Sequence, residues 1–458
     1  MKSFKIFALT GILSLGGVSL AFAGGGYIID ENGSPSLWDN SAAISYHPES
    51  GICGSFTNAE MRDKLETELA RWDGLSDVDL DLSQVAGAIA TDVTSADYTT
   101  YYVGFDDDGE QYTTGLEDGL NPIIFDDDGE IIAEVAGNSN KFNVLGFANP
   151  SGFTSDFTEI VDGQAVINCR CLAGNANGEC CSGGLTDCAN PVVFSEDETD
   201  FTIVHEFGHF LNLDHTQVNA EVIDDGDDDN DDDLATMYPI SVNAAEQISP
   251  TRDDIVALAS LYPSSSFNSS TCTVTGSLLD SSGNELRCAD VQAVTTDLAD
   301  TVAFVSGALA PAVDNNGDGD TADDGECTSD CGDFILHLLP GKTYTIKVMP
   351  IDTSFIGGSG ISPCANGQLT GIVEQELEVI SGTTCTAGGT FAFPSALTTT
   401  STGGTTASGA DTTSSSSLGC TLNAQAQPVS LLAMAWLLLP IGLLVLRKKL
   451  LIANISKF

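Results

Sequence analysis

Residues 203–216 read Ile-Val-His-Glu-Phe-Gly-His-Phe-Leu-Asn-Leu-Asp-His-Thr, a run that holds three of the chain's five histidines. His205 and His209 are four positions apart, so on a helix their imidazoles share one face and lie one turn apart. Both can then reach a single zinc ion, and Glu206 on the same face can take a proton from zinc-bound water. The run therefore predicts a helix that carries a zinc site and its general base.

A third histidine can complete this zinc site. His215 follows His209 by six residues, far enough to return to the metal if the helix stops and the backbone turns back. Asn212 lies at the turning point, where a left-handed conformation is needed, and asparagine tolerates that conformation better than any residue except glycine. We therefore expect His205, His209 and His215 to converge on one metal ion, and Asn212 to adopt a positive φ.

With these histidines the sequence resembles the metzincin metallopeptidases, and among them the matrixins. The family pattern is His-Glu-x-x-His-x-x-Gly-x-x-His with a methionine turn downstream. The run Ala235-Thr236-Met237-Tyr238-Pro239 is similar to the matrixin form of that turn. The chain departs from the pattern at Asn212, which replaces glycine. It also departs in the distance from His215 to Met237, which is lengthened by an acidic insertion at 224–233.

The resemblance implies roles for these residues. The three histidines would hold zinc as neutral imidazoles, and Glu206 would act as general base and then pass its proton to the leaving amine. Met237 would form a hydrophobic base beneath the metal, and Tyr238 would serve either transition-state stabilisation or packing. An extended substrate would pair with one strand as an added strand and lie beside a pocket wall. The residues implied to bind it are Leu145, Gly146, Phe147, Ala148, Pro239 and Ile240.

Residues 24–263 would form this peptidase domain, an α+β fold in which a twisted mixed sheet carries the active-site helix and a C-terminal helix. Thr57 and Glu60 form a capping box that opens an amphipathic helix, and Gly74 ends it. A final helix is expected to open at Pro250. Its expected buried face consists of Ile255, Leu258 and Leu261. Strands are expected at 42–47, 143–150 and 164–168.

Residues 272–394 form a second expected unit, an antiparallel β-sandwich, because short alternating strands are punctuated there by Gly, Asp and Pro. The run Leu339-Pro340-Gly341-Lys342-Thr343-Tyr344 resembles the turn of prealbumin-like, carboxypeptidase-regulatory-like modules that are attached to many surface enzymes. This unit shows no catalytic constellation, so we expect a role in spacing or binding. The expected strands are 272–279, 289–295, 334–338, 344–349 and 373–380.

Both ends of the chain indicate export. Residues 1–23 are typical of a signal peptide, with two lysines, an apolar run and small residues at the cleavage site. Residues 395–419 are almost wholly Thr, Ser, Gly and Ala, which predicts a linker. Within 420–449, an apolar stretch long enough to span a bilayer precedes a basic cluster, and 450–458 form a short tail.

This C-terminal order is similar to the sorting signals of exported bacterial proteins. The resemblance implies that a sorting protease cuts near Gly419 or Cys420 and leaves the protein at the bacterial cell envelope or surface, or releases it to the medium. Until that cut, the helix would hold the chain in the membrane. A permanent single-span membrane anchor is the alternative.

The charge of the chain excludes some partners and suggests calcium. There are 66 acidic against 15 basic residues, a formal net charge of -51, so general nucleic-acid binding is excluded because it requires clustered Lys and Arg. The acidic run 224–233 is either a calcium site or a solvated loop. A more specific calcium signal is the run 314–320. It has oxygen-bearing side chains at alternate positions and glycine at the sixth, as in the first half of an EF-hand-type loop. The residues that would bind calcium are Asp314, Asn316, Asp318 and Asp320.

The cysteines support an oxidising destination. Of thirteen, six precede residue 200, six lie between 272 and 385, and Cys420 stands alone. Even numbers in each unit of an exported chain predict about three disulfides per unit, with the pairing left open. A cysteine-rich metal site is the alternative for residues 169–188.

The sequence thus predicts an exported zinc endopeptidase that hydrolyses peptide bonds in proteins through a zinc-bound water activated by Glu206. One alternative is a cell-surface binding or adhesion protein whose peptidase domain is inactive or latent. Another is a zinc hydrolase that acts on substrates other than peptides. The two histidines outside the motif, His47 and His337, are expected to be ordinary strand or surface residues.

Overall fold

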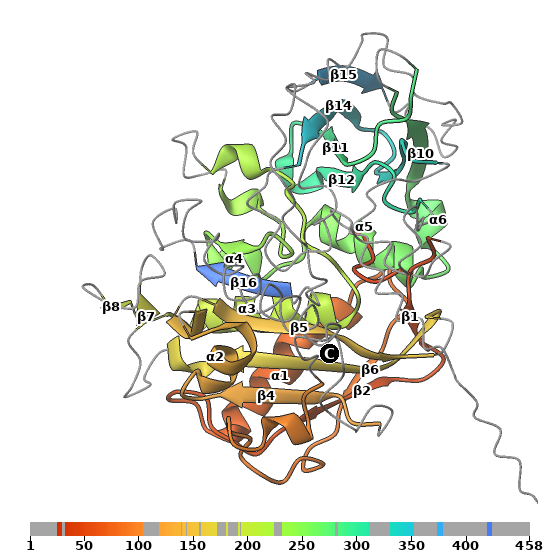
Figure 1. Cartoon of the computed structure of the whole chain (residues 1–458). Helices are drawn as coiled ribbons and strands as arrows, with labels where there is room; N and C mark the ends of the chain where they lie inside the picture. Colours follow the sequence, from red (N-terminus) through yellow and green to blue (C-terminus); the bar gives the residue numbers. More distant parts are fainter. Residues whose placement is uncertain are drawn as a thin grey trace, which may run out of the picture.

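The computed structural model describes much of the chain between residues 25 and 351, together with two strands beyond it (Figure 1). The described residues are 25–29, 33–103, 119–138, 140–142, 144–154, 157–171, 180–181, 191–192, 194–223, 231–279, 283–310, 330–351, 373–378 and 419–423. The predicted signal peptide, calcium loop and apolar C-terminal stretch lie outside these ranges. Among the described helices, none is long and apolar enough to cross a membrane.

An eight-stranded mixed sheet organises the first part of the chain, in the order β3-β2-β4-β6-β5-β16-β9 with β1 beside β6. Its strands are β1 (Leu37–Trp38), β2 (Ile44–Pro48), β3 (Leu82–Gln84), β4 (Pro122–Asp126), β5 (Val144–Phe153), β6 (Glu159–Asn168), β9 (Ile240–Ser241) and β16 (Gly419–Asn423). The pairs β2–β3, β2–β4 and β4–β6 are parallel, whereas β5 is antiparallel to β6. The predicted combination of helices with a mixed sheet is confirmed.

The two faces of this sheet bury separate apolar cores, because neighbouring residues of a strand point to opposite faces. In β4, Ile123 and Phe125 pack in the core that contains α1 (Asn58–Asp73) and α3 (Glu196–Phe210). Ile124, between them, packs in a second core with α2 (Glu130–Ala136). The helix that bears the histidine motif therefore lies on one defined face of the sheet.

Two capping boxes fix the starts of α1 and α3. Thr57 and Glu60 cap α1, which ends at Gly74 as predicted. Ser195 and Glu198 cap α3 in the same way, a box that the sequence analysis missed. The two helices are joined by the indole Nε1 of Trp72, which donates to the carbonyl oxygen of Val204 at 2.9 Å. The helix is amphipathic as predicted, and its buried apolar residues are Met61, Leu65, Leu69 and Trp72.

Helix α5 (Arg252–Leu261) differs from its prediction in its start and its buried face. It opens at Thr251 rather than Pro250, because Thr251 and Asp254 form the capping box. Ile255 is only half-buried, whereas Val256 is buried in the core of the second unit. The prediction of Ile255 was wrong because α5 packs against both units. The short helices α4 (Ala244–Gln247) and α6 (Phe267–Ser270) lie before and after α5 in the chain.

The second unit consists of antiparallel strands in two sheets that share one apolar core. β10 (Cys272–Ser277) pairs with β13 (Asp333–Leu338). The other sheet has the order β12-β11-β14-β15 and contains β11 (Ala289–Val294), β12 (Val302–Val305), β14 (Thr343–Pro350) and β15 (Val373–Glu378). The five predicted strands are present, and β12 was not predicted. In Figure 1 this unit lies at the opposite end from β4 and β6, with α5 and α6 between.

Several cysteines are paired. Cys53 and Cys169 form a disulfide with an S–S distance of 2.01 Å, which joins the loop after β2 to the end of β6. Both belong to the first predicted set of six. The described cysteines of the second set, Cys272, Cys288 and Cys331, are also disulfide-bonded. In addition, β7 (Cys180–Cys181) pairs with β8 (Pro191–Val192) in a small antiparallel sheet.

Candidate metal centre

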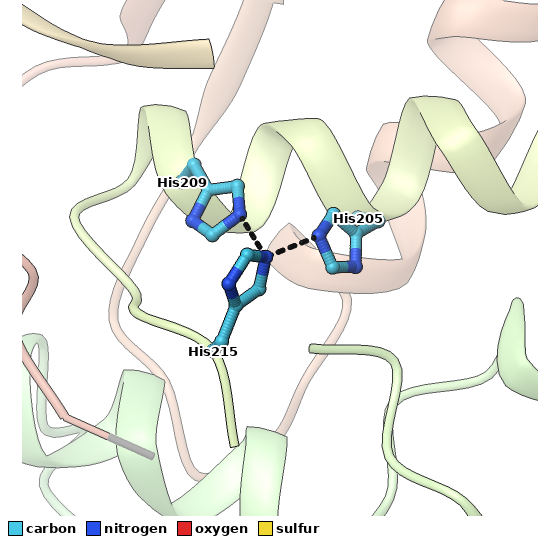
Figure 2. A group of neighbouring side chains, drawn as sticks. All are labelled: His205, His209 and His215. Atoms are coloured by element: carbon cyan, nitrogen blue, oxygen red, sulfur yellow. Dashed lines mark hydrogen bonds between the residues drawn. The ribbon is translucent and has the colours of Figure 1, made fainter. Parts of the chain in front are cut away.

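The backbone reverses directly after α3, and this reversal brings the third histidine back. Asn212 has a φ of 75°, in the left-handed region that the sequence predicted. Across the turn, the backbone N–H of Leu213 donates to the carbonyl oxygen of Gly208 at 2.8 Å. His215 consequently faces His205 and His209 of α3, and Figure 2 shows the three rings turned toward one another.

The three imidazoles form a closely spaced nitrogen cluster. Nε2 of His215 lies 3.2 Å from Nε2 of His205 and 3.1 Å from Nε2 of His209 (Figure 2). All three side chains are fully buried. Nitrogens bound to one tetrahedral ion at about 2.0–2.1 Å lie about 3.3 Å apart, so the observed spacing fits a shared metal ion. Within the described ranges, this is the one group of side chains placed to hold a metal.

In His205 and His209, a hydrogen bond at Nδ1 determines which ring nitrogen carries the proton and which carries a free lone pair. Nδ1 of His205 lies 2.7 Å from the carbonyl oxygen of Thr236, and Nδ1 of His209 lies 2.7 Å from that of Leu213. A carbonyl oxygen only accepts, so each Nδ1 carries the proton and donates it. In the neutral ring Nε2 is then unprotonated and directs its lone pair at His215, as a metal ligand requires.

Burial keeps these rings neutral. It lowers the pKa of His205 and of His215 well below the usual value, and the neighbouring histidines lower both further. Burial also lowers the pKa of His209 to about 4. Metal ions bind the unprotonated imidazole, so the fold presents the ligands in the binding form near neutral pH.

The side chain of Glu206 packs against strand β5. Its side chain is fully buried. A Cβ placed on Gly146 would lie 2.9 Å from Cγ and 3.1 Å from Oε1 of Glu206, so only glycine lets β5 approach this closely. Gly146, implied as a substrate-binding residue, is therefore in contact with the carboxylate implied as general base.

Met237 packs against α3, the helix that carries His205 and His209. It is buried, and a Cβ on Gly208 would collide with its Sδ. Gly208 lies one position before His209, so Met237 packs against the turn of α3 that carries His209. The carbonyl oxygen of Met237 also accepts from the backbone N–H of Thr216 at 3.1 Å, which ties the methionine segment to the chain just after His215. The neighbouring Tyr238 packs in a small apolar cluster with Leu234, which fits the packing reading of its role.

Asp254 orients the methionine segment and was not predicted from the sequence. Its carboxylate is buried and accepts from the backbone N–H groups of Thr236 and Met237, both at 2.9 Å. It also accepts from the N–H and the hydroxyl of Thr251. Asp254 thereby fixes Thr236, whose carbonyl oxygen holds His205. The only sequence signal was an acidic residue in the first turn of a helix, which indicates a response to the helix dipole and nothing about the metal.

Asn212, the departure from the family glycine, has a clear function in this fold. Its Oδ1 accepts from the N–H of Ile28 at 2.7 Å, and its Nδ2 donates to the carbonyl oxygens of Ile28 and Ser36 at 2.9 and 2.8 Å. The backbone N–H of Asp214 also donates to the carbonyl oxygen of Gly25. The N-terminal segment 25–36 is thus bound to the loop between the second and third histidines.

We expect Asn212→Gly to destabilise the protein although glycine suits the backbone conformation better. The loss of three hydrogen bonds of about 1 kcal/mol each outweighs the relief of left-handed strain, which leaves a net loss of about 1–2 kcal/mol. Urea unfolding of both proteins measures this. Asp330→Gly is the matched control, because Asp330 has a φ of 62° and an exposed side chain. A stabilised Asn212→Gly protein would contradict the bonding role.

Side chains of the second unit form hydrogen bonds with the chain just after His215. The side chain of Gln217 donates to Asp290 Oδ2 in β11 at 2.8 Å, and Gln292 of the same strand donates to the carbonyl oxygen of Gln217 at 3.2 Å. Asp253 of α5 bonds the Thr216 side chain and accepts from the backbone N–H of Ala303 in β12 at 2.7 Å. The unit that the sequence assigned to spacing or binding therefore also positions the chain just after His215.

The raised pKa of Asp253 should make the folded protein less stable in mild alkali. Burial, with the nearby Asp254, raises its pKa to about 8 from an ordinary value of 3.8. The folded chain therefore keeps a proton there that the unfolded chain has lost, so stability falls as pH rises through this window. We expect the free energy of unfolding to decrease by roughly 1–3 kcal/mol between pH 6 and pH 8, and to decrease less in Asp253→Asn. Equal pH slopes for the two proteins would exclude Asp253 as the cause.

The remaining predicted site residues are placed as follows. Leu145, Phe147 and Ala148 are buried in β5, and Ile240 begins β9 just after Pro239. The calcium candidates Asp314, Asn316, Asp318 and Asp320 lie outside the described residues. His47 and His337 are strand residues of β2 and β13, as expected, and Nδ1 of His47 accepts from the backbone N–H of Asn121.

No protein-family model matches this chain, and a search of curated proteins finds no match. The interpretation of the site consequently rests on its own geometry and on the motif.

Proposed function

We propose that this chain is an exported zinc-dependent endopeptidase of the metzincin type, similar in motif to the matrixins, which resides at the bacterial cell envelope or surface or is released from it. The convergence of three Nε2 atoms supports this proposal most strongly. His205 and His209 both direct lone pairs at His215, and a single proton on His215 could satisfy only one of them. A cation in the centre satisfies all three.

The donor set favours zinc. Three neutral imidazoles at tetrahedral spacing with a fourth position left for water or substrate are the donor set of catalytic zinc. Bound there, zinc would act as a Lewis acid and lower the pKa of water toward neutrality. His205, His209 and His215 would hold it, while the carbonyl oxygens of Thr236 and Leu213 keep two of the rings in position.

The chain's own residues would perform the proton transfers and the binding. Glu206 follows the ligand His205, so its carboxylate would accept the proton of the attacking water and deliver it to the amine that leaves. Because Gly146 of β5 contacts Glu206, a peptide paired along β5 would pass beside that carboxylate. Peptide substrates add to strand edges through main-chain hydrogen bonds, which favours extended, unfolded protein segments as substrates.

Cleavage of an unfolded protein by the full chain tests this proposal. We expect new peptide termini, detected by mass spectrometry, that disappear with a zinc chelator and return when zinc is restored. Peptide cleavage that persists in the chelator would contradict the zinc mechanism. If only ester or other non-peptide substrates are hydrolysed, the general zinc-hydrolase alternative replaces the peptidase.

A further inference from the structure

Strand β5 is not the free edge of the mixed sheet. The distant C-terminal strand β16 runs antiparallel along it, with Gly419 opposite Ala148, Cys420 opposite Phe147 and Thr421 opposite Gly146. More than 200 residues of chain separate β5 from β16. Figure 1 shows β16, in blue, lying between β5 and the region of α4.

The other side of β16 is paired as well. Leu422 lies opposite Ile240 and Asn423 opposite Ser241, in a parallel pairing with β9. β16 therefore occupies the space between β5 and β9, and it contacts α3. Its Thr421 is aligned with Gly146, the residue in contact with Glu206.

These are the two backbone segments assigned above to the substrate. Strand β5 would supply the edge on which an extended peptide pairs, and Pro239 and Ile240 the neighbouring wall. Without β16, β5 would expose unpaired N–H and C=O groups, which form the template that an added strand requires. The C-terminal segment thus meets the geometric requirements of a bound peptide while it is covalently part of the chain.

We infer that Gly419–Asn423 is an intramolecular ligand of the proposed substrate site between β5 and β9, which any peptide substrate must displace. The inference rests on the proposed function for the identity of that site, although the pairing itself does not. A tethered segment competes at an effective concentration of about millimolar, so substrates at micromolar concentration would be excluded from most molecules. The full chain is accordingly expected to cleave substrates slowly at micromolar substrate concentration, and removal or displacement of the tail should accelerate the cleavage.

A proline in β16 tests this inference in the full chain. Thr421→Pro removes one backbone N–H and fixes the φ of the residue that pairs with Gly146, next to the register shift between Thr421 and Leu422, so we expect β16 to pair less stably with β5. Thr406→Pro, in the predicted linker, is the matched control. The first measurement is amide hydrogen exchange of residues 144–148 in the metal-free proteins, which is independent of catalysis. We expect exchange to be at least about tenfold faster in Thr421→Pro than in the wild-type and control chains.

A second measurement uses a fluorescent synthetic peptide with the sequence of residues 417–425. We expect it to bind Thr421→Pro and not the wild-type chain, because β16 already pairs with β5 and β9 in the wild-type chain. With zinc present, kcat/KM for a short peptide substrate should be at least about tenfold higher in Thr421→Pro than in Thr406→Pro.

The outcomes separate the two proposals. Faster exchange and peptide binding without hydrolysis in any variant would establish the intramolecular ligand and refute the peptidase. Hydrolysis at equal rates in all three chains, with equal exchange at 144–148, would overturn the intramolecular ligand and leave the peptidase standing.

Discussion

Replacing Glu206 with glutamine is expected to stop hydrolysis while one zinc ion stays bound. Glutamine keeps the size of the side chain but cannot accept the proton of the attacking water. A general base contributes about 10²–10⁴-fold to the rate, so kcat should fall by at least that factor. The rate should be measured on a short peptide substrate in the Thr421→Pro chain, together with zinc content by elemental analysis.

Two control variants make this result specific. Asp197→Asn changes an exposed acidic residue in the first turn of the same helix and should leave both rate and zinc content unchanged. His209→Ala removes one of three ligands and should lose both. A Glu206→Gln protein that retains more than a tenth of the parent rate would show that another group accepts the proton.

Replacing Asp254 with alanine is expected to be the most destabilising substitution outside the histidines. Four hydrogen-bond donors of three residues, Thr236, Met237 and Thr251, would lose their common acceptor in a fully buried position. Breaking such a network costs about 3–5 kcal/mol. Because Thr236 also holds His205, zinc affinity should fall by about 10–100-fold. Guanidinium unfolding and zinc titration of the purified protein measure the two effects.

The comparison that isolates this network uses two further variants. Asp254→Asn keeps one accepting oxygen and should lose less stability than Asp254→Ala. Glu246→Ala removes an exposed carboxylate from α4, close to Asp254 in the chain, and should change stability by less than about 0.5 kcal/mol. If Asp254→Ala unfolds at the same denaturant concentration as Glu246→Ala, Asp254 does not organise the methionine segment.

The features that the sequence predicted well are local. The spacing of His205, His209 and His215 defines one helix face and one return of the chain, and Asn212 is the residue that permits the return. The Thr57 capping box and Gly74 likewise bracket α1 through residues that are neighbours in the chain. Helical period and backbone preference act over a few residues, so their consequences can be deduced without the tertiary structure.

The features that were missed depend on contacts between distant segments. Gln217 and Asp290 are separated by 73 residues, and Asn212 and Ile28 by 184, and nothing in either local pattern indicates its partner. Ile255 was assigned to the buried face of α5 because this helix was expected to pack within residues 24–263 alone, whereas both units pack on it. The pairing of β16 with β5 is a further case, since residues 419–423 were expected to be a linker end and a sorting signal.

Three of the distant contacts meet at residues 212–217 and at the methionine segment beside them. The N-terminal segment binds Asn212, the second unit binds Gln217, and α5 fixes the methionine segment through Asp254. The loop that carries the third histidine is thus held by parts of the chain before, after and far beyond the motif. We therefore regard residues 24–263 as dependent on the second unit for the geometry of the third histidine.

X-ray absorption at the zinc edge, on the full chain loaded with one equivalent of zinc, tests the zinc centre most directly. We expect one tightly bound zinc ion per chain with three imidazole nitrogens and one further light-atom ligand at about 2.0–2.1 Å. His215→Ala should reduce the imidazole signal to two rings. A sulfur ligand at about 2.3 Å, or an unchanged spectrum in His215→Ala, would place the zinc elsewhere and contradict the account.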